Sequence, residues 1–429
     1  MAQEARLTRR MIGVLAARLP EARLDRVKDP RRKQGQRWKL GIVLRAVLMA
    51  MVAGCKSLAL AEALTAEMSV PLRKRLGIAR RIADTTMRDV LCALDPEELR
   101  GPLHALVRAA HRRKALEPEK LPFGVVAMDG KSTAVPSCDD AYAQRQSQGE
   151  GLVGVVRTMT CTLISSPAMP CIDAIPIPAA TNEMGHFEAT VRSLVQAYNG
   201  IDLFRMISYD AGACSEHNAR VVREELGLHY LLGLKGTQPT LLAEAQRLLA
   251  SLQWHRADAS SEDVIGGPHT VVRHVYLTEE MAGFGGWEHL RTVLRVESET
   301  LDSRGQRTAH DNRYFVSSLP ASRLRASQWL LVVRLHWGVE NNCHHTLDDA
   351  FEEDNRPWIK SDPRGMVVVA LLRRVAYNLL TLFRSVTQRS EERRATPWRD
   401  LLRWFYNAII AATDADLSTL RPRPRAMDP

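Results

Sequence analysis

The sequence predicts an α/β protein in which a helical segment precedes the α/β core and a β-rich segment interrupts it. Before residue 120, apolar residues recur at intervals of three and four, which is typical of amphipathic helices. Between residues 121 and 235, short apolar runs alternate with amphipathic stretches in the order β, ββ, α, β, α, β, which is typical of an α/β domain. Residues 236–320 are mostly of β type, and a helical pattern returns after them.

These changes in pattern divide the chain into five segments. They are a helical N-terminal domain over 1–120, the first part of the core over 121–235, a β-rich insertion over 236–320, the C-terminal helices of the core over 321–390, and a C-terminal helix and tail over 391–429. The N-terminal domain carries basic clusters such as Arg73-Lys74-Arg75 and Arg112-Arg113-Lys114. Solvated helix faces explain most of these clusters, whereas a DNA-contacting domain is the sharper hypothesis.

The individual elements follow from periodicity and from start and stop residues. Apolar spacing predicts a helix over 40–51, and Asp95 followed by Pro96 predicts the start of another. The proline at position 176 places its strand at a sheet edge. Core strands are predicted over 122–128, 153–164, 171–177, 204–209 and 230–234, core helices over 187–198 and 215–226, insertion strands over 269–277, 291–300 and 313–318, and later helices from 327 and over 366–384.

The composition indicates a globular protein with an anionic partner. Of the 429 residues, 45% are apolar, which is enough to form ordinary hydrophobic cores. The net charge of +10 favours nucleic acid as a partner. The longest apolar stretch, 40–55, is interrupted by Arg45 and is shorter than the about 20 residues of a bilayer span, which predicts no membrane segment. The first ten residues lack an apolar signal core, which predicts a cytoplasmic protein. Seven cysteines without a CxxC pair argue against a disulfide framework and a zinc ribbon.

Two aspartates share a context in the predicted core. Asp129 and Asp210 each follow a run too apolar for a surface strand, and a small residue follows each of them. A turn or helix-capping role explains either residue alone. Together, at the carboxyl ends of neighbouring strands, they occupy the place where α/β domains gather ligands.

A third polar group is predicted on one helix face. On a helix, five side chains fall within about 100° of arc because their spacings are three and four. They are Trp337, Glu340, Asn341, His344 and Asp348. Such a face would be unfavourable against an apolar core, which leaves a solvated surface or the neighbourhood of a metal site.

Carboxylates from two strands and one helix are suited to magnesium. Mg²⁺ takes oxygen ligands and keeps waters that substrate oxygens can displace. Two such ions, about 3.5–4 Å apart, can activate a nucleophile and stabilise the leaving oxygen of a phosphodiester. His344 and His345 suggest zinc as an alternative, but no further ligand stands at a zinc spacing.

At these residues the chain resembles the DDE-type insertion-sequence transposases, in the branch grouped with the H-repeat-associated proteins. Six motifs in the same order carry the resemblance, which covers most of the chain. They are Asp29-Pro30-Arg31 with 35–40, Met128-Asp129-Gly130-Lys131, Thr181-Asn182-Glu183, Asp210-Ala211, Leu234-Lys235-Gly236-Thr237-Gln238, and the block 336–354 that contains His336, Trp337, Glu340 and Asn341.

The resemblance implies an RNase H-like catalytic core, with the β-rich insertion before the final acid. It implies Asp129, Asp210 and Glu340 as catalytic and metal-binding residues. With two Mg²⁺ ions, or Mn²⁺ as a substitute, they would cleave and transfer DNA strands at the ends of an insertion sequence. The implied partners are double-stranded DNA, as terminal inverted repeats and target, and a second copy of the chain in a homodimer.

Under this hypothesis, other residues in or beside these motifs contact DNA or support the site. Lys131, Arg334 and Lys235 are candidates for phosphate contacts, although a loop lysine such as Lys235 is usually just solvated. Trp337 is a candidate for stacking on a flipped base, with the sealing of a core edge as the plainer explanation. Asn341, His344 and Asp348 are expected to support the metal ligands. A metal-dependent nuclease on the same fold and a non-catalytic DNA-binding relative remain as alternatives.

Overall fold

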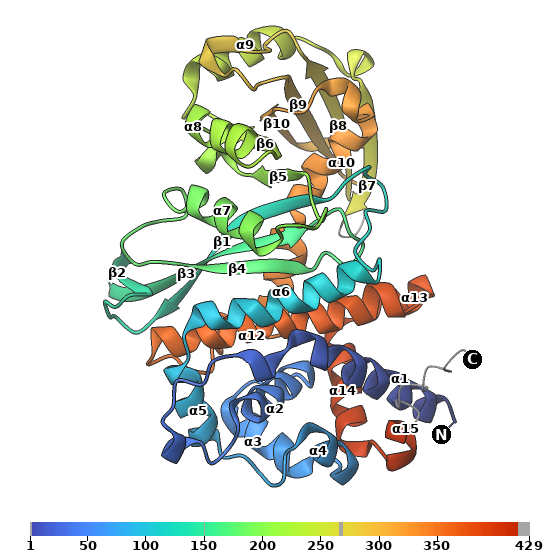
Figure 1. Cartoon of the computed structure of the whole chain (residues 1–429). Helices are drawn as coiled ribbons and strands as arrows, with labels where there is room; N and C mark the ends of the chain where they lie inside the picture. Colours follow the sequence, from blue (N-terminus) through green and yellow to red (C-terminus); the bar gives the residue numbers. More distant parts are fainter. Residues whose placement is uncertain (1, 150, 266–268, 419–429) are drawn as a thin grey trace, which may run out of the picture.

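One mixed sheet forms the centre of the molecule, and helices cover both of its faces (Figure 1). The computed structural model describes residues 2–149, 151–265 and 269–418. The predicted α/β class is therefore confirmed in its outline, and the end of the predicted tail, 419–429, lies outside the described residues. The strands are β1 (Val125–Val135), β2 (Ala143–Gln148), β3 (Gly151–Leu163), β4 (Cys171–Ile177), β5 (Met206–Tyr209), β6 (His229–Leu234), β7 (Ala259–Ile265), β8 (His269–Thr278), β9 (Thr292–Leu301) and β10 (Arg307–Ser317).

The order of strands along the sheet is β2-β3-β1-β5-β6-β10-β9-β8-β7, and β4 pairs with β3. β1 is antiparallel to β3 and parallel to β5, and β5 is parallel to β6. Among the described strands β4 pairs with β3 alone, so the edge position predicted from Pro176 is confirmed. The strands of the predicted insertion extend this same sheet, because residues Tyr314–Ser317 of β10 pair with Leu231–Leu234 of β6.

The helices before the sheet form a separate layer with the last helices of the chain. Apolar side chains of both groups share one core, and α12 lies against α2, α5 and α6. Asp95 caps α6 as predicted, its carboxylate accepting the Glu97 backbone N–H. The helices of this layer are α1 (Ala2–Arg18), α2 (Leu40–Val52), α3 (Leu58–Glu67), α4 (Val70–Leu76), α5 (Asp84–Ala93), α6 (Pro96–Arg112), α12 (Pro363–Leu382), α13 (Glu391–Arg394), α14 (Trp398–Ala411) and α15 (Asp414–Ser418).

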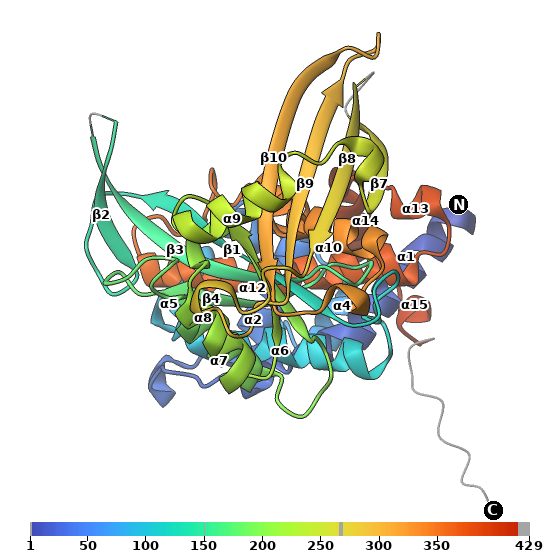
Figure 2. The same cartoon turned by 90° about the horizontal axis from the view of Figure 1, so that it is seen from above.

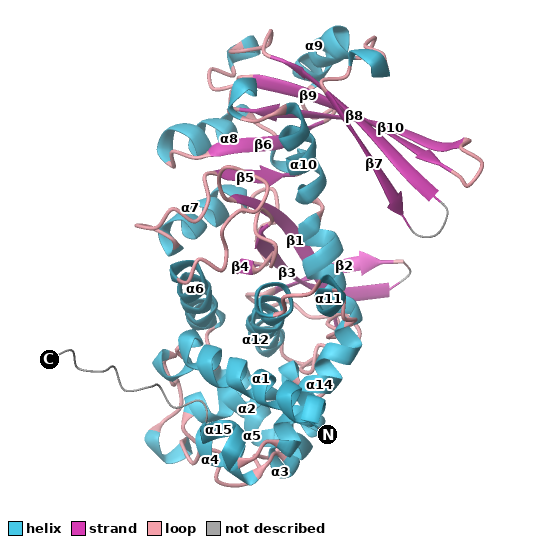
Figure 3. Ribbon diagram, turned by 90° about the vertical axis from the view of Figure 1, so that its right-hand side faces the viewer, coloured by secondary structure: helices cyan, strands magenta, loops and turns pink. Residues whose placement is uncertain are grey.

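The two faces of the sheet carry different helices (Figure 3). On one face, α7 (Phe187–Ala197) and α8 (Glu216–Arg220) lie over β1, β5 and β6, and α9 (Pro239–Leu249) covers the insertion strands. On the other face, α10 (Ala326–His336) buries Trp329 and Leu330 against β1. A π-helical turn, η9 (Val339–His344), and α11 (His345–Asp349) continue the chain along β1. The far halves of β9 and β10 extend beyond all of these helices (Figure 2).

Two expectations about local structure need correction. The strand predicted to end before Asp129 continues to Val135, because Lys131, Thr133 and Val135 alternate inward and find buried partners. The polar strands β2 and β7 had no apolar alternation and were not predicted; each is held by the neighbouring strand in a hairpin.

One helical segment, Pro363–Thr387, is long and apolar enough to cross a bilayer by length and composition alone. All of its most apolar window is buried inside the molecule, where α12 forms the centre of the helical layer. Its hydropathy is thus that of a core helix.

Candidate active site

Strands β1 and β5 bring the two predicted aspartates to matched positions. Ala127 pairs with Ser208 in the parallel ladder, and Asp129 and Asp210 each follow two residues later. Because side chains alternate with a period of two and neighbouring strands lie about 4.8 Å apart, both carboxylates point to the face that carries α10. Asp210 is the first residue after β5, and its Oδ1 accepts the Gly212 N–H at 2.8 Å.

The predicted third acid lies on the segment that crosses over Asp129. Nδ1 of His344 is 3.4 Å from Oδ2 of Asp129, and Glu340 is exposed about one turn earlier in the same π-helical turn. Single π turns inside helices are frequent at functional sites. Within the described residues, oxygens of the three predicted carboxylates do not gather within 4.8 Å of one another, so the arrangement is open.

A fourth carboxylate, not predicted as a site residue, reaches the same place from the loop before α7. A Cβ built on Gly130 would lie 2.0 Å from the carboxyl carbon of Glu183, so only glycine allows this approach. Burial raises the pKa of Glu183 above its ordinary value, and the charges of Asp129 and Asp210 add to the effect. The sequence signal for Glu183 was its place in the Thr181-Asn182-Glu183 motif.

This donor set suits a hard divalent cation. Asp129, Asp210 and Glu183 concentrate negative charge that a bound cation would relieve, and all of the donor atoms are oxygens. Asp129 and Asp210 are placed to hold such a cation together, with Glu340 on the facing segment. The two other groups of close acidic and histidine side chains in the described part of the chain lie elsewhere.

A buried histidine lies beneath the two aspartates. His336 is 5% exposed, and its Nδ1 is 3.0 Å from the hydroxyl oxygen of Ser208, the β5 residue two before Asp210. Burial lowers the pKa of His336, although the charges of Asp129 and Asp210 act in the opposite direction. A neutral imidazole here can hold the end of α10 against β5 and adds no positive charge that would compete with a cation for Asp129 and Asp210.

Lys131, predicted to contact phosphate, has two carboxylate partners instead. Its Nζ is 2.7 Å from Oδ1 of Asp348 and 3.2 Å from Oδ2 of Asp354, and the lysine is 7% exposed. Thr133 Oγ1 donates to Asp354 at 2.9 Å. Alternate residues of β1, namely Asp129, Lys131 and Thr133, therefore fasten the segment from His344 to Asp354 along the strand. Asp348 thus contacts β1 through Lys131. Its support of the metal ligands and a phosphate contact by Lys131 both stay predictions.

Replacement of Lys131 with methionine is expected to loosen this attachment. Asp348 and Asp354 would then face each other without the Lys131 ammonium group between them. We expect the free energy of unfolding to fall by about 1–3 kcal/mol. A double-mutant cycle with Asp348→Asn should show a coupling of about 1 kcal/mol. Arg403→Met, which breaks the exposed pair with Asp400 on α14, serves as control and should cost well under 1 kcal/mol. If urea denaturation shows that the effects of Lys131→Met and Asp348→Asn simply add, Lys131 does not attach the segment to β1 through Asp348.

The other predicted residues line a groove between α10 and the insertion strands. The groove has a volume of about 610 Å³, and Trp337, Asn341 and Arg334 contribute to its lining with Arg273 and Arg313. The Arg313 guanidinium lies over the Trp337 ring, 4.7 Å from its centroid, and Arg334 pairs with Asp263 at 2.6 Å. Trp337 therefore faces a groove whose lining mixes polar and apolar side chains, rather than sealing the core. Lys235 is exposed directly after β6, at the sheet edge where Asp210 lies one strand away.

Comparison with known proteins identifies one part of the chain. Residues 22–106 match the family described as DDE_Tnp_1-associated. The chain carries a DDE_Tnp_1-associated domain. This finding confirms the resemblance to DDE-type transposases, whereas the narrower H-repeat-associated branch stays a prediction.

The remaining comparisons add little to this assignment. No curated protein matches the chain. One solved structure, described as a piggyBac transposase synaptic complex with hairpin DNA, is similar over 97% of this chain and 83% of that chain, with a TM-score of 0.44 and 12% identity.

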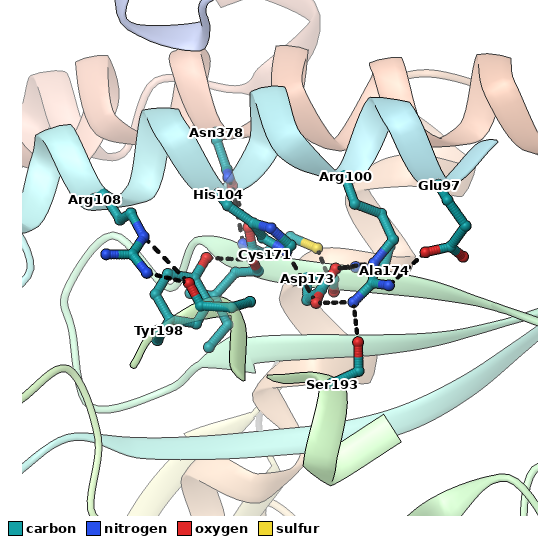
Figure 4. Close-up of polar contacts among 12 residues, drawn as sticks. Glu97, Arg100, His104, Arg108, Cys171, Asp173, Ala174, Ser193, Tyr198 and Asn378 are labelled. Atoms are coloured by element: carbon teal, nitrogen blue, oxygen red, sulfur yellow. Dashed lines mark hydrogen bonds and ion pairs between the residues drawn. The ribbon is translucent and has the colours of Figure 1, made fainter. Parts of the chain in front are cut away.

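The DDE_Tnp_1-associated domain is joined to the sheet by a buried ion-pair network (Figure 4). Its last helix, α6, points Arg100 and His104 at Asp173 on β4, which is fully buried. Arg100 donates from Nε at 3.0 Å and from Nη2 at 2.7 Å to the two carboxylate oxygens. The domain is therefore attached to β4, which β3 connects to the strand β1 that carries Asp129.

Proposed function

We propose that this chain is a transposase that cleaves and joins DNA at the ends of an insertion sequence, with Asp129, Asp210 and Glu340 as metal ligands. The observation that carries the proposal is the register of β1 and β5, which sets Asp129 beside Asp210 under the segment that bears Glu340. The strand order β4-β3-β1-β5-β6 supports an RNase H-like core, with β7–β10 as the insertion before the final acid. The proposal includes a homodimer on paired ends, in the cytoplasm.

The side chains of the site have separate tasks in this mechanism. Bound Mg²⁺, or Mn²⁺, supplies the Lewis acidity that activates a water or 3′-hydroxyl and stabilises the leaving oxygen. Asp129 and Asp210 hold the cation from a rigid sheet. Glu340 approaches from an exposed turn, which leaves the side toward solvent open for a phosphodiester. His344 orients Asp129, and Lys131 with Asp348 fixes the turn on β1.

The groove beside Glu340 suits an unpaired nucleotide of the DNA substrate. Its apolar walls and the Trp337 ring can stack on a base, and Arg334, Arg313 and Asn341 can contact the adjoining phosphate or base edge. Lys235 lies where it can reach the phosphate backbone of the adjoining DNA. We therefore propose that Trp337 and Arg334 contact DNA near the cleavage point.

Removal of the metal is the first test of this function. DNA that carries the ends of the element should be cut in Mg²⁺ or Mn²⁺ and remain intact in EDTA, as followed with end-labelled duplex on denaturing gels. Binding measured in EDTA serves as control and should persist.

The products separate the candidate functions. Joined strands indicate a transposase, whereas cut but never joined strands indicate a metal-dependent nuclease on the same fold. Binding without any cutting in Mg²⁺ would leave the non-catalytic DNA-binding relative as the function.

A further inference from the structure

A second basic groove lies on the face of the sheet opposite to the acids. It has a volume of about 560 Å³. Its walls are the chain from Arg23, which follows the turn η1 (Leu19–Ala22), through the turn η2 (Leu24–Arg26), together with α6 and the end of α7. We call it the α6 groove. α6 and α7 lie on one side of the sheet and α10 lies on the other (Figure 3). Val339, next to Glu340, packs in the same core as α10, so the α6 groove and Glu340 lie on opposite sides.

The lining of the α6 groove is strongly cationic. Arg23 and Arg26 contribute from the turns, and Arg108 and Arg112 contribute from successive turns of α6. Among the described residues of the lining, Glu98 is the acidic side chain that opposes these four arginines. Guanidinium groups of this kind match phosphate geometry with paired hydrogen bonds.

Three of these arginines are available to a ligand. Arg23, Arg26 and Arg112 are exposed, and their side chains have no hydrogen bond or ion pair within the part of the chain that the structure describes. Arg108 is held in place instead, because its Nε donates to the carbonyl oxygen of Ala197 at 3.1 Å and its guanidinium lies over the Tyr198 ring. The groove thus combines one fixed guanidinium with three unpaired ones.

The backbone of Arg23 is a second, independent observation. Its φ is +50°, in the left-handed region, where it joins η1 to η2. Glycine or asparagine adopts this conformation at lower cost than arginine. Strained residues of this kind cluster at ligand-binding sites, and Arg23 lines the groove.

We propose that the α6 groove binds the phosphate backbone of duplex DNA away from the cleavage site. This inference rests on the proposed function only in taking DNA as the substrate. Four guanidiniums without an exposed aromatic ring in the lining favour backbone contact over base reading. The DDE_Tnp_1-associated domain, which supplies Arg23 and Arg26, would then anchor a duplex segment while the acids act on another.

The test compares two triple variants of the full chain. In one, Arg23, Arg26 and Arg112 are each replaced with glutamine. In the control, Arg256, Lys360 and Arg399, which are exposed and outside both grooves, are replaced in the same way, so the lost charge is equal. Binding to a duplex of unrelated sequence is measured by fluorescence anisotropy in EDTA, from about 50 to 200 mM salt.

The slope of log K against log salt should become less steep by about 2–3 in the groove variant, since each lost phosphate contact removes about 0.9. The control variant should change the slope by less than about 1. Equal slopes for the two variants, with melting temperatures like that of the wild type, overturn the inference. The salt slope is measured without metal and is therefore independent of cleavage. If the groove variant changes the slope but the wild type never cuts DNA in Mg²⁺, the proposed function is refuted and the inference about the α6 groove stands.

Discussion

Replacement of Asp210 with asparagine is expected to lower the rate of Mg²⁺-dependent DNA cleavage by about a thousandfold, or about 4 kcal/mol of activation free energy. The amide has the shape of the carboxylate but no charge, so it is a poor ligand for a hard cation. Its Oδ1 can still accept the Gly212 N–H, which keeps the turn after β5 intact. The loss therefore falls on metal binding and not on the fold.

Two measurements define this result. Cleavage is followed with end-labelled DNA, and binding is followed in EDTA, where the variant should stay within about twofold of the wild type because the basic surfaces supply most of the affinity. Asp202→Asn, which removes an exposed acid paired with Arg205 just before β5, is the matched control and should cut normally. Cleavage by Asp210→Asn at the rate of the wild type would show that Asp210 is no metal ligand.

The parts of this site that the sequence predicted are those that follow from strand periodicity. The apolar runs before Asp129 and Asp210 identified two buried strands, and the parallel order of an α/β core placed their ends side by side. The register of Ala127 with Ser208 supplies what the sequence left open, namely that the two acids lie at matched positions on one face.

The parts that could not be predicted depend on partners far away in the chain. Lys131 follows Asp129 in a polar stretch whose sequence predicts a turn. Its partners Asp348 and Asp354 lie more than 200 residues later. Nothing local indicates that β1 continues, because Ser132 and Thr133 pair with the distant strand β3 and their hydroxyls contact Glu183 and Asp354. The approach of Glu183 is likewise set by the missing side chain of Gly130.

Replacement of Asp173 with asparagine is expected to cost about 3–5 kcal/mol in the free energy of unfolding. Asp173 is fully buried on β4, where it accepts from Arg100 and from the Ala174 backbone N–H at 2.9 Å (Figure 4). Nε2 of His104 lies 3.0 Å from its second carboxylate oxygen. The neutral amide keeps one acceptor oxygen but no charge, so Glu97 would be the carboxylate left to pair with the buried Arg100 among the described residues. Because this network joins α6 to the sheet, urea denaturation should also show an earlier loss of the helical layer.

The control for this change is the exposed pair Arg205–Asp202. Asp202→Asn breaks a contact of similar length, 2.6 Å, in solvent, and should cost less than about 1 kcal/mol. Equal costs for the two variants would mean that burial of Asp173 adds nothing to the attachment of α6.

The pH dependence of stability tests the network of Asp173, Arg100 and His104 in a second way. Burial alone would raise the pKa of Asp173, but His104 and Arg100 outweigh it and lower the pKa from 3.8 to about 2. A carboxyl whose folded pKa lies below its unfolded value stabilises the protein above the unfolded value and loses this contribution as the pH falls through the folded one. The wild type should therefore lose about 2 kcal/mol of its free energy of unfolding through this group, progressively between about pH 5 and pH 1. Asp173→Asn lacks the group, so the difference between the two proteins should narrow over that range, and a difference that stays constant would contradict the ion pair.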